Sequence, residues 1–360
     1  MSASSSQPSA SSQRPSIHRP GALEASDIGR RLRPDELRTV RNALYKRGLA
    51  ARDAVGLLDP EAGEALGSRL AVEGVRRVGR YDSASDGATK LVLESSGGAV
   101  FESVILRIRS GRSAVCVSSQ VGCAARCRFC ATGYMGVARG LAAEEIVEQV
   151  ALAGRILRDE GRRLRNVVFM GMGEPMHNRA AVEETVARLV DRRWFALSAR
   201  HVMVSTIGVV EELRPFVERF PEVNLALSLH AARQEVRARL MPLAARTSLE
   251  ELRDALRAIE AVRRRPTMVE CVLLDGINDG DADLSALLAY CRGLQVRINL
   301  IPWNPIEQAP ELRPATTARH RRFAAALRAA GFAVTTRMSL GADVAAACGQ
   351  LARRDVLTAR

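Results

Sequence analysis

The amino-acid sequence predicts an α/β protein, a partial (βα)6 barrel preceded by an N-terminal helical unit and a β extension. The first observation is an alternation, from residue 112 onward, of short β-branched runs with longer amphipathic segments, which is typical of βα units around a parallel sheet. The second is size, because 360 residues that are 47% hydrophobic suffice for one enzyme-sized core and a smaller appendage. The third is a change near residue 74, where helical spacing gives way to short β-like stretches.

The first 30 residues are rich in Ser, Pro, Ala and Gln and poor in apolar residues. Such a segment cannot offset the entropy cost of ordering, so we predict a disordered tail over residues 1–30. A targeting presequence is the alternative, but the acidic Glu24 and Asp27 come early and arginines are sparse.

Residues 31–110 are expected to form the helical unit and the β extension. Leu37, Val40 and Leu44 recur at helical spacing within residues 33–73. The part that follows has turn-prone Ser-Asp-Gly and Ser-Gly-Gly segments between stretches of strand character. These stretches are Lys90–Leu93 and Val100–Ile108.

Residues 111–355 are expected to form the barrel and a C-terminal segment. The six expected strands are Ala114–Ser118, Asn166–Met170, His201–Thr206, Val223–Ser228, Met268–Leu274 and Val296–Ile301. The helices expected between them lie near Ala142–Leu157, Ala180–Arg192, Glu211–Glu218, Leu249–Arg263 and Ala282–Arg292. In parallel βα folds the functional site lies at the carboxyl ends of the strands, so the residues just after each run are the candidates.

The chain is strongly basic, with 53 Lys and Arg against 40 Asp and Glu and a net charge of +13. A polyanionic partner such as nucleic acid is the natural expectation, because neutralising phosphates releases counterions. All of the basic residues except Lys46 and Lys90 are arginine, however, which also fits a GC-rich gene. Charge alone therefore leaves both interpretations open.

The seven cysteines indicate metal binding or catalysis rather than a disulfide framework. The N-terminus lacks the apolar core of a secretory signal, and no apolar run approaches the roughly 18–20 residues that cross a bilayer. We therefore expect a cytoplasmic protein with no membrane partner.

Four of the cysteines lie between Cys116 and Cys130, and the last three of them fall in the loop that follows the first expected strand. Cys123, Cys127 and Cys130 form a C-x3-C-x2-C motif. Three thiolates at this spacing can hold three irons of one [4Fe-4S] cluster and leave the fourth iron open to a small molecule. A zinc site is the alternative, but no local histidine or second C-x2-C pair completes the four ligands that structural zinc normally takes.

Further segments follow one another in a recognisable order along residues 82–352. They are CVSSQVGCAARCRFCATG from Cys116, EIVEQV from Glu145, GMGEPMHN from Gly171, VSTIGVV from Val204, LALSLHA from Leu225, LMP from Leu240, GIND from Gly276, NLIPWNP from Asn299 and TTRMSLGADVAAACGQLA from Thr335. In these segments the chain resembles the radical S-adenosylmethionine superfamily, and within it the RlmN/Cfr family of RNA adenine methyltransferases. The resemblance implies a radical-SAM barrel that uses one [4Fe-4S] cluster, on Cys123, Cys127 and Cys130, and S-adenosyl-L-methionine.

The resemblance also implies which residues hold S-adenosylmethionine after successive strands. They are Gly173, Glu174, Ser205, Ser228, Leu229, His230 and Asn304. Glycines at 171 and 173 would let the backbone approach the ligand, and the Glu174 carboxylate can accept hydrogen bonds from the ligand's ammonium group. Taken singly, a tight turn explains the glycines, and a capping or core role explains a Ser or His at a strand end.

Three catalytic residues are implied in the same way: Glu102, Cys116 and Cys348. Cys348 would carry the methyl group, Cys116 would resolve the RNA adduct through a transient disulfide bond, and Glu102 would accept the ring proton. Glu102 is offset by one residue from the family spacing, so an exposed strand carboxylate is the alternative. Cys271 and Cys291 lie in apolar patterns and are interpreted as buried hydrophobic residues.

The function implied by the resemblance is methylation of C2 of adenosine in 23S rRNA, with tRNA as a further candidate substrate. A Cfr-type C8 methyltransferase and a radical SAM enzyme with another substrate are the alternatives. They stay open because several positions depart from the family pattern in regions linked to recognition. The departures are Tyr134-Met135, Arg139-Gly140-Leu141 and the Leu-Ala-Ala that follows Pro242.

The expected partners are RNA and an electron donor such as flavodoxin or ferredoxin, and the protein is expected to be a monomer. RNA contacts are expected on the helical unit and on the basic stretches Arg107–Arg112 and Arg162–Arg165. Solvated surface charge is the alternative for these stretches.

Overall fold

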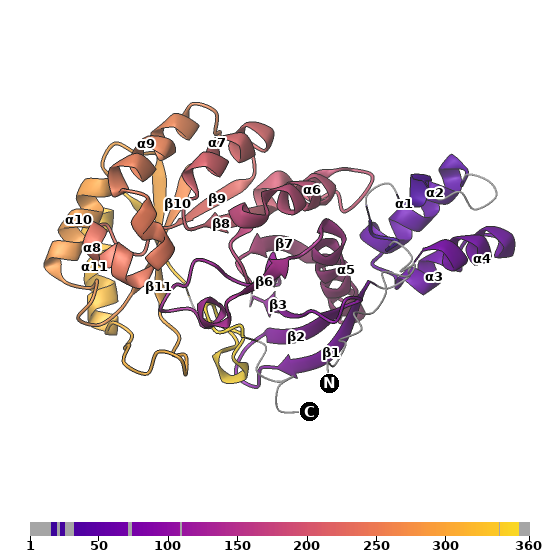
Figure 1. Cartoon of the computed structure of the whole chain (residues 1–360), viewed down its shortest axis with the longest axis horizontal. Helices are drawn as coiled ribbons and strands as arrows, with labels where there is room; N and C mark the ends of the chain where they lie inside the picture. Colours follow the sequence, from indigo (N-terminus) through magenta and orange to yellow (C-terminus); the bar gives the residue numbers. More distant parts are fainter. Residues whose placement is uncertain are drawn as a thin grey trace, which may run out of the picture.

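The computed structural model describes residues 16–19, 22–25, 32–70, 74–108, 110–337 and 339–352 (Figure 1). A ten-stranded sheet forms its centre, in the order β1-β2-β3-β4-β7-β8-β9-β10-β11-β12. The strands are β1 (Val75–Asp82), β2 (Ala88–Ser95), β3 (Val100–Arg107), β4 (Ser113–Cys116), β7 (Leu164–Phe169), β8 (Val202–Thr206), β9 (Asn224–Ser228), β10 (Thr267–Leu273), β11 (Val296–Pro302) and β12 (Ala333–Thr336). A second sheet pairs β5 (Gln120–Gly122) with β6 (Val137–Gly140).

The part of the large sheet from β4 to β12 is parallel and follows chain order, which makes an open, partial barrel. Helices cover its outer side (Figure 1). They are α5 (Ala143–Asp159), α6 (Arg179–Val190), α7 (Val210–Arg219), α8 (Gln234–Leu240), α9 (Leu249–Glu260), α10 (Asp281–Cys291) and α11 (Thr317–Ala329). The six expected strands and five expected helices are all present close to their expected bounds, so the predicted partial (βα)6 barrel is confirmed.

Single 3-10 turns occupy several of the connections. They are Ala131–Met135, Pro175–Asn178, Ala199–His201, Pro242–Arg246 and Ala342–Val344. None of the described helices combines the length and the apolar character that crossing a bilayer requires.

Strand β12 is a seventh parallel strand that the sequence pattern did not reveal. It has four residues, pairs with β11, and is largely exposed at the edge of the sheet. An exposed edge strand does not need the continuous apolar run by which buried parallel strands are recognised.

Strands β1, β2 and β3 form an antiparallel extension that continues the barrel sheet, because β3 pairs directly with β4. β2 and β3 contain the two expected stretches and are almost wholly buried. β1 was not expected. Six of its eight residues are exposed, so it lacks the apolar alternation that marks a half-buried strand.

The N-terminal unit consists of short helices with an apolar core of their own, and it lies on the side of the molecule away from α10 and α11 (Figure 1). Its elements are α1 (Ala22–Ala25), α2 (Pro34–Arg41), a π-helical turn (Asn42–Lys46), α3 (Ala51–Val55) and α4 (Pro60–Arg69). The unit docks on the barrel through aromatic contacts, with the ring centroids of Tyr45 and Trp194 4.7 Å apart. Val147 of α5 closes the same core.

Two segments of the predicted disordered tail are packed rather than free. Ile17 and Leu23 are buried in the core of the N-terminal unit. The Ser16 hydroxyl donates to the Glu148 carboxylate of α5 at 2.7 Å, and the Arg188 guanidinium donates to the carbonyl of His18. The prediction is therefore wrong for residues 16–19 and 22–25, because two apolar side chains anchor a segment that is otherwise polar. The rest of residues 1–30 lies outside the described part of the chain.

Candidate active site

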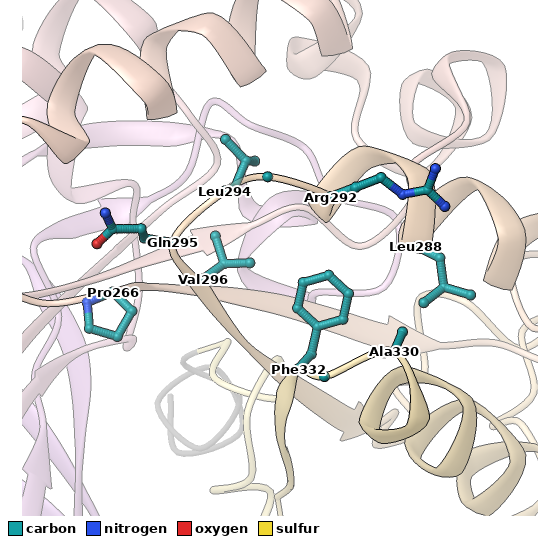
Figure 2. A pocket seen from close by; sticks show the side chains of 10 residues that line it. Pro266, Leu288, Arg292, Leu294, Gln295, Val296, Ala330 and Phe332 are labelled. Atoms are coloured by element: carbon teal, nitrogen blue, oxygen red, sulfur yellow. The ribbon is translucent and has the colours of Figure 1, made fainter.

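The pocket drawn in Figure 2 has a volume of about 430 Å³ and lies at the amino ends of three strands. Pro266 precedes β10, Gln295 precedes β11, and Phe332 precedes β12. Its lining, taken from the described part of the chain, includes none of the candidate residues. The candidates gather instead at the opposite, carboxyl ends of the strands.

The three cysteines of the C-x3-C-x2-C motif lie on one loop between β5 and β6, which we call the cluster loop (residues 123–136). The Cys123 N–H donates to the carbonyl oxygen of Gly136 at 2.9 Å, which closes the loop on itself. Gly122 is required at its start, because a Cβ there would collide with the same oxygen. Arg126 has a φ of 51° and so turns the chain just before Cys127.

The three thiols are close enough to affect one another's ionisation. Burial raises the pKa of Cys123 to about 12, and the neighbouring Cys130 adds to the rise. The pKa of Cys127 lies well above its usual value because of burial and because of both neighbouring thiols. Deprotonating all three therefore requires a strongly cationic partner, which iron would provide.

An iron-sulfur cluster on these thiols stays a prediction, and it needs a different arrangement of ligands from that of a single ion. Among the described residues, no three Cys, His, Asp or Glu side chains converge on a point that one metal ion could occupy. A zinc ion needs such convergence, whereas the cysteines of a [4Fe-4S] cluster each bind a different iron.

Gly171 and Gly173 follow β7 and pack against the segment after β4. A Cβ on Gly171 would collide with Ser118, and one on Gly173 would collide with Gln120. Gly173 also has a φ of 98°, which favours glycine. The close approach that these glycines allow is to the protein's own chain, so a tight turn accounts for both. A contact of Gly173 with a ligand stays a prediction.

The Glu174 carboxylate joins two of the loops at the carboxyl ends of the strands. It accepts hydrogen bonds from Met176 N–H at 3.0 Å and from Ile207 N–H, after β8, at 2.9 Å. Burial raises the pKa of Glu174. The carboxylate keeps lone pairs for a further donor, as the predicted contact with an ammonium group needs.

A row of polar side chains crosses the sheet at equivalent positions of neighbouring strands. Ser228, Glu270 and Asn299 are register partners on β9, β10 and β11. The Glu270 carboxylate accepts from the Ser205 hydroxyl and from the Asn299 amide, each at 3.1 Å. The Ser205 and Ser228 hydroxyls are also 3.1 Å apart. The predicted Ser205 and Ser228 therefore belong to one buried network, which the structure centres on Glu270.

Glu270 was not among the candidates that the sequence analysis named. It lies in an otherwise apolar stretch and is buried, and a carboxylate in that position needs partners. A single acidic residue inside an apolar strand pattern was the signal that could have identified it.

His230 and Leu229 follow β9, and both are buried. The His230 ring accepts from the Val272 N–H at 3.1 Å through Nδ1, and its edge faces the Phe129 ring, with centroids 4.6 Å apart. Burial lowers the pKa of His230 to about 3, so the ring is neutral near pH 7. In this arrangement His230 supports the cluster loop through Phe129. A direct contact of His230 or Leu229 with a cofactor stays a prediction.

The segment that carries Cys348 is bound to the cluster loop. Ala131 N–H donates to the Gly349 carbonyl and the Thr132 hydroxyl to the Leu351 carbonyl, each at 2.7 Å. The Asn304 amide donates to the Cys348 carbonyl at 3.1 Å, which ties the segment to the loop after β11. Figure 1 shows the yellow C-terminal segment beside the loop. The exposed Cys348 thiol is therefore held next to the three motif cysteines by backbone contacts.

Glu102 is completely buried on β3, so the alternative of an exposed strand carboxylate is wrong. Its carboxylate lies 3.4 Å from the Lys90 ammonium and accepts from the Ala352 N–H at 2.9 Å. Cys116 is buried at the end of the adjacent β4. Chain segments far apart in sequence thus bring Glu102, Cys116 and the Cys348 segment together.

Comparison with known proteins identifies a family for this geometry. Residues 117–289 match the model of the radical SAM superfamily. A probable RNA methyltransferase of Rhodopirellula baltica is 45% identical over 333 residues, which are 92% of this chain and 86% of that protein. The dual-specificity RNA methyltransferase RlmN of Sorangium cellulosum is 41% identical over 337 residues, which cover 82% of this chain and 86% of that protein. The chain belongs to the RlmN/Cfr family of radical S-adenosylmethionine RNA methyltransferases.

A solved structure of this kind agrees with the assignment to the RlmN/Cfr family. The crystal structure of a radical SAM methyltransferase from Sphaerobacter thermophilus is 38% identical, with a TM-score of 0.82 over 87% of this chain and 92% of that chain. The family resemblance and the radical-SAM barrel expected from the sequence are therefore both confirmed.

In this RlmN/Cfr-family protein a single arginine lies within electrostatic reach of both candidate thiols outside the motif. Burial raises the pKa of Cys116 to about 12. The protein atoms packed around the Cys348 thiol raise its pKa to about 11, although the residue as a whole is exposed, and the Arg337 guanidinium opposes both shifts. Arg337 follows β12, and its Nη1 lies 3.2 Å from the Met170 sulfur. The Cys116 thiol also accepts a hydrogen bond from the Met170 backbone. Arg337, which the sequence analysis did not single out, thus favours the thiolate forms.

Replacing Arg337 by Gln is expected to slow alkylation of Cys348 at any fixed pH below about 11. Loss of the positive charge raises the pKa of the thiol further, and the thiolate fraction then falls about tenfold for each unit of pKa. The measurement is the iodoacetamide rate at Cys348 against pH, by peptide mass spectrometry of cluster-free protein. Arg328→Gln, on the exposed face of α11, is the control. An unchanged pH profile for Arg337→Gln would show that this charge does not act on the thiol.

Proposed function

We propose that this protein methylates C2 of an adenosine in 23S rRNA, with tRNA as a further candidate substrate. The observation that supports this best is the position of the exposed Cys348 thiol. Its segment is hydrogen-bonded to the cluster loop at Ala131 and Thr132, and both Cys116 and Glu102 lie on the adjoining strands. The proposed methyl carrier Cys348, the second thiol of Cys116 and the proposed base Glu102 thus lie close together beside the cluster loop.

For the cofactors, we propose that Cys123, Cys127 and Cys130 hold one [4Fe-4S] cluster and that S-adenosyl-L-methionine binds beside it. When bound and reduced, the cluster would supply the electron for reductive cleavage of S-adenosylmethionine. The residues proposed to line the S-adenosylmethionine site are Gly173, Glu174, Ser205, Ser228, Leu229, His230 and Asn304. The buried network on Glu270 holds the two serines in place.

A covalent route is required because an adenine ring carbon is too weak a nucleophile to attack a methylsulfonium directly. Cys348 first accepts a methyl group on sulfur, and loss of a hydrogen atom from that methyl group makes a carbon radical that adds to the ring. Glu102 would accept the proton from the ring carbon, and the adduct would give up its unpaired electron to the oxidised cluster. The Cys116 thiolate would then attack the Cys348 sulfur and form a disulfide, and the released CH2 carbon would take the electron pair of the broken S–C bond and pick up a proton, which frees the methylated base. The Lys90 ammonium lies 3.4 Å from the Glu102 carboxylate.

RNA would approach the exposed side of Cys348. Of the two basic stretches expected to contact RNA, Arg107 already pairs with the Glu160 carboxylate at 2.6 Å. Arg163 and Arg165 are exposed and remain the better candidates for phosphate contacts. We propose further that the protein works as a monomer in the cytoplasm and that flavodoxin or ferredoxin reduces it.

The test is anaerobic reaction of the reconstituted protein with methyl-labelled S-adenosylmethionine, a chemical reductant and protein-free 23S rRNA. The digested nucleosides are analysed by mass spectrometry, and a reaction without RNA is the control. Labelled 2-methyladenosine is expected. Labelled 8-methyladenosine would instead assign a Cfr-type reaction, and cleavage of S-adenosylmethionine without labelled adenosine would mean that another molecule is the substrate. Transfer RNA is tested in the same way.

A further inference from the structure

Arg237 is the largest fully buried side chain in the described part of the chain, with an exposed fraction of 1%. Its Nη2 donates to the Ile207 carbonyl at 2.6 Å, but Nε and Nη1 have no hydrogen-bond partner among the described residues. No carboxylate forms an ion pair with it there. A guanidinium cannot lose its charge under ordinary conditions, so its burial without an anion is costly and calls for a partner.

The surroundings of Arg237 point to the cluster loop. Helix α8 packs on that loop, and the Arg128 N–H donates to the Leu240 carbonyl at 2.9 Å. Cys127 lies in the same buried cluster as Val236, the neighbour of Arg237. The Arg237 guanidinium is also within electrostatic reach of the Cys127 side chain.

The other group near Arg237 is the Tyr290 hydroxyl, which is buried and also has no hydrogen-bond partner in the described part of the chain. A buried water between the two would satisfy some of these atoms, but a neutral phenol does not compensate a full positive charge. In the described part of the chain, the potential anion that acts on Arg237, besides Tyr290, is the thiol of Cys127 on the cluster loop. Tyr290 therefore does not compensate the charge of Arg237, and its substitution is a suitable control.

We propose that Arg237 is a positioning residue that supplies the buried counter-charge of the iron-sulfur cluster and thereby favours its reduced state. This inference rests on the proposed function, since it requires the cluster on Cys123, Cys127 and Cys130. Three thiolates outweigh the positive charge of the oxidised cluster core, so the assembly is an anion and becomes more negative on reduction. Net charge and hydrogen bonds to the sulfurs set the potential of such clusters, and a fixed cation in a dry environment acts strongly. Nε and Nη1 of Arg237, which have no hydrogen-bond partner among the described residues, would be available as donors to it.

The test is the reduction potential of the reconstituted cluster, measured without S-adenosylmethionine by anaerobic titration followed by electron paramagnetic resonance. In Arg237→Met, the ratio of reduced to oxidised cluster at a fixed potential is expected to fall about tenfold, equivalent to about 59 mV for a one-electron couple. Arg237→Gln, which can still donate to the Ile207 carbonyl, should show the same loss and replaces Arg237→Met should that variant not fold. Arg237→Lys should restore most of the effect, and Tyr290→Phe should leave the potential at the wild-type value.

Each outcome decides the matter. A reduction potential that is unchanged in Arg237→Met and in Arg237→Gln would overturn the proposal that Arg237 is the counter-charge. An equal shift of the reduction potential in Tyr290→Phe would assign the effect to the tyrosine instead. A wild-type protein that takes up no iron and sulfide would overturn the proposed function itself, which separates the two failures. Melting of the cluster-free protein gives a second readout. There Arg237→Met should be as stable as wild type or more so, because it removes a charge that has no anion.

Discussion

Cys348→Ala is expected to abolish RNA methylation, by about 10⁴-fold or more, while cleavage of S-adenosylmethionine to deoxyadenosine continues near the wild-type rate. The thiol is the proposed methyl carrier, so without it no carbon radical can form on the protein. The segment should keep its position, because Asn304 and Ala131 bind the backbone carbonyls of residues 348 and 349 rather than the sulfur. The substitution thus removes one atom from an otherwise intact site.

For Cys348→Ala, two quantities are measured in the same anaerobic reaction. They are the amount of labelled methyl group incorporated into RNA and the amount of deoxyadenosine released. Cys291→Ala, which alters a buried cysteine on α10, is the matched control and should methylate RNA within a few-fold of wild type. Normal methylation by Cys348→Ala would eliminate the S-methylcysteine route. Loss of both readouts would indicate a displaced cluster loop rather than a missing methyl carrier.

Cys116→Ala is expected to stop the reaction after one turnover with RNA bound covalently to the protein. Cys116 is buried at the end of β4, with its thiol near the Met170 N–H and the Arg337 charge, and both favour the thiolate that must attack Cys348. When that nucleophile is absent, nothing breaks the bond between the Cys348 sulfur and the methylene group that joins it to the adenine. Methylated product should fall to less than one per protein, and the adduct should appear instead.

The adduct is detected as a ribonuclease-sensitive shift on a denaturing gel and as a nucleotide mass on the Cys348 peptide. The double variant Cys116→Ala with Cys348→Ala should give no adduct, which shows where the RNA is attached. Multiple turnovers by Cys116→Ala, with free RNA and free protein, would mean that another group resolves the intermediate.

Most of the barrel could be predicted from the sequence because the six expected parallel strands are largely apolar runs that contribute to the core. The exposed edge strands β1 and β12 could not, since neither has such a run. The packed segments around Ile17 and Leu23 were missed for a related reason. Two apolar residues in a polar stretch carry little signal, and their burial depends on partners far along the chain.

The candidate site also contains residues that could be predicted from local sequence and residues that could not. The three motif cysteines could be named because one short loop holds them all. Glu270 was missed because its importance arises from the register between β9, β10 and β11, which brings Ser228 and Asn299 to its sides. The burial of Glu102 depends on Ala352, which is 250 residues away, so no local pattern could reveal it.

The large sheet is continuous from β1 to β12, and this continuity limits how the protein can be truncated. The radical SAM superfamily model ends at residue 289 and begins at residue 117, one residue after Cys116. A protein cut to that region would keep the motif cysteines but lose the proposed base, both proposed reacting thiols and the β3 strand that pairs with β4. The residues proposed for methyl transfer therefore all lie outside the region that matches the superfamily model. In chimeras of two relatives, exchange of residues 117–289 should transfer the ability to cleave S-adenosylmethionine. Exchange of the segments before and after that region should transfer the choice of the product that is methylated.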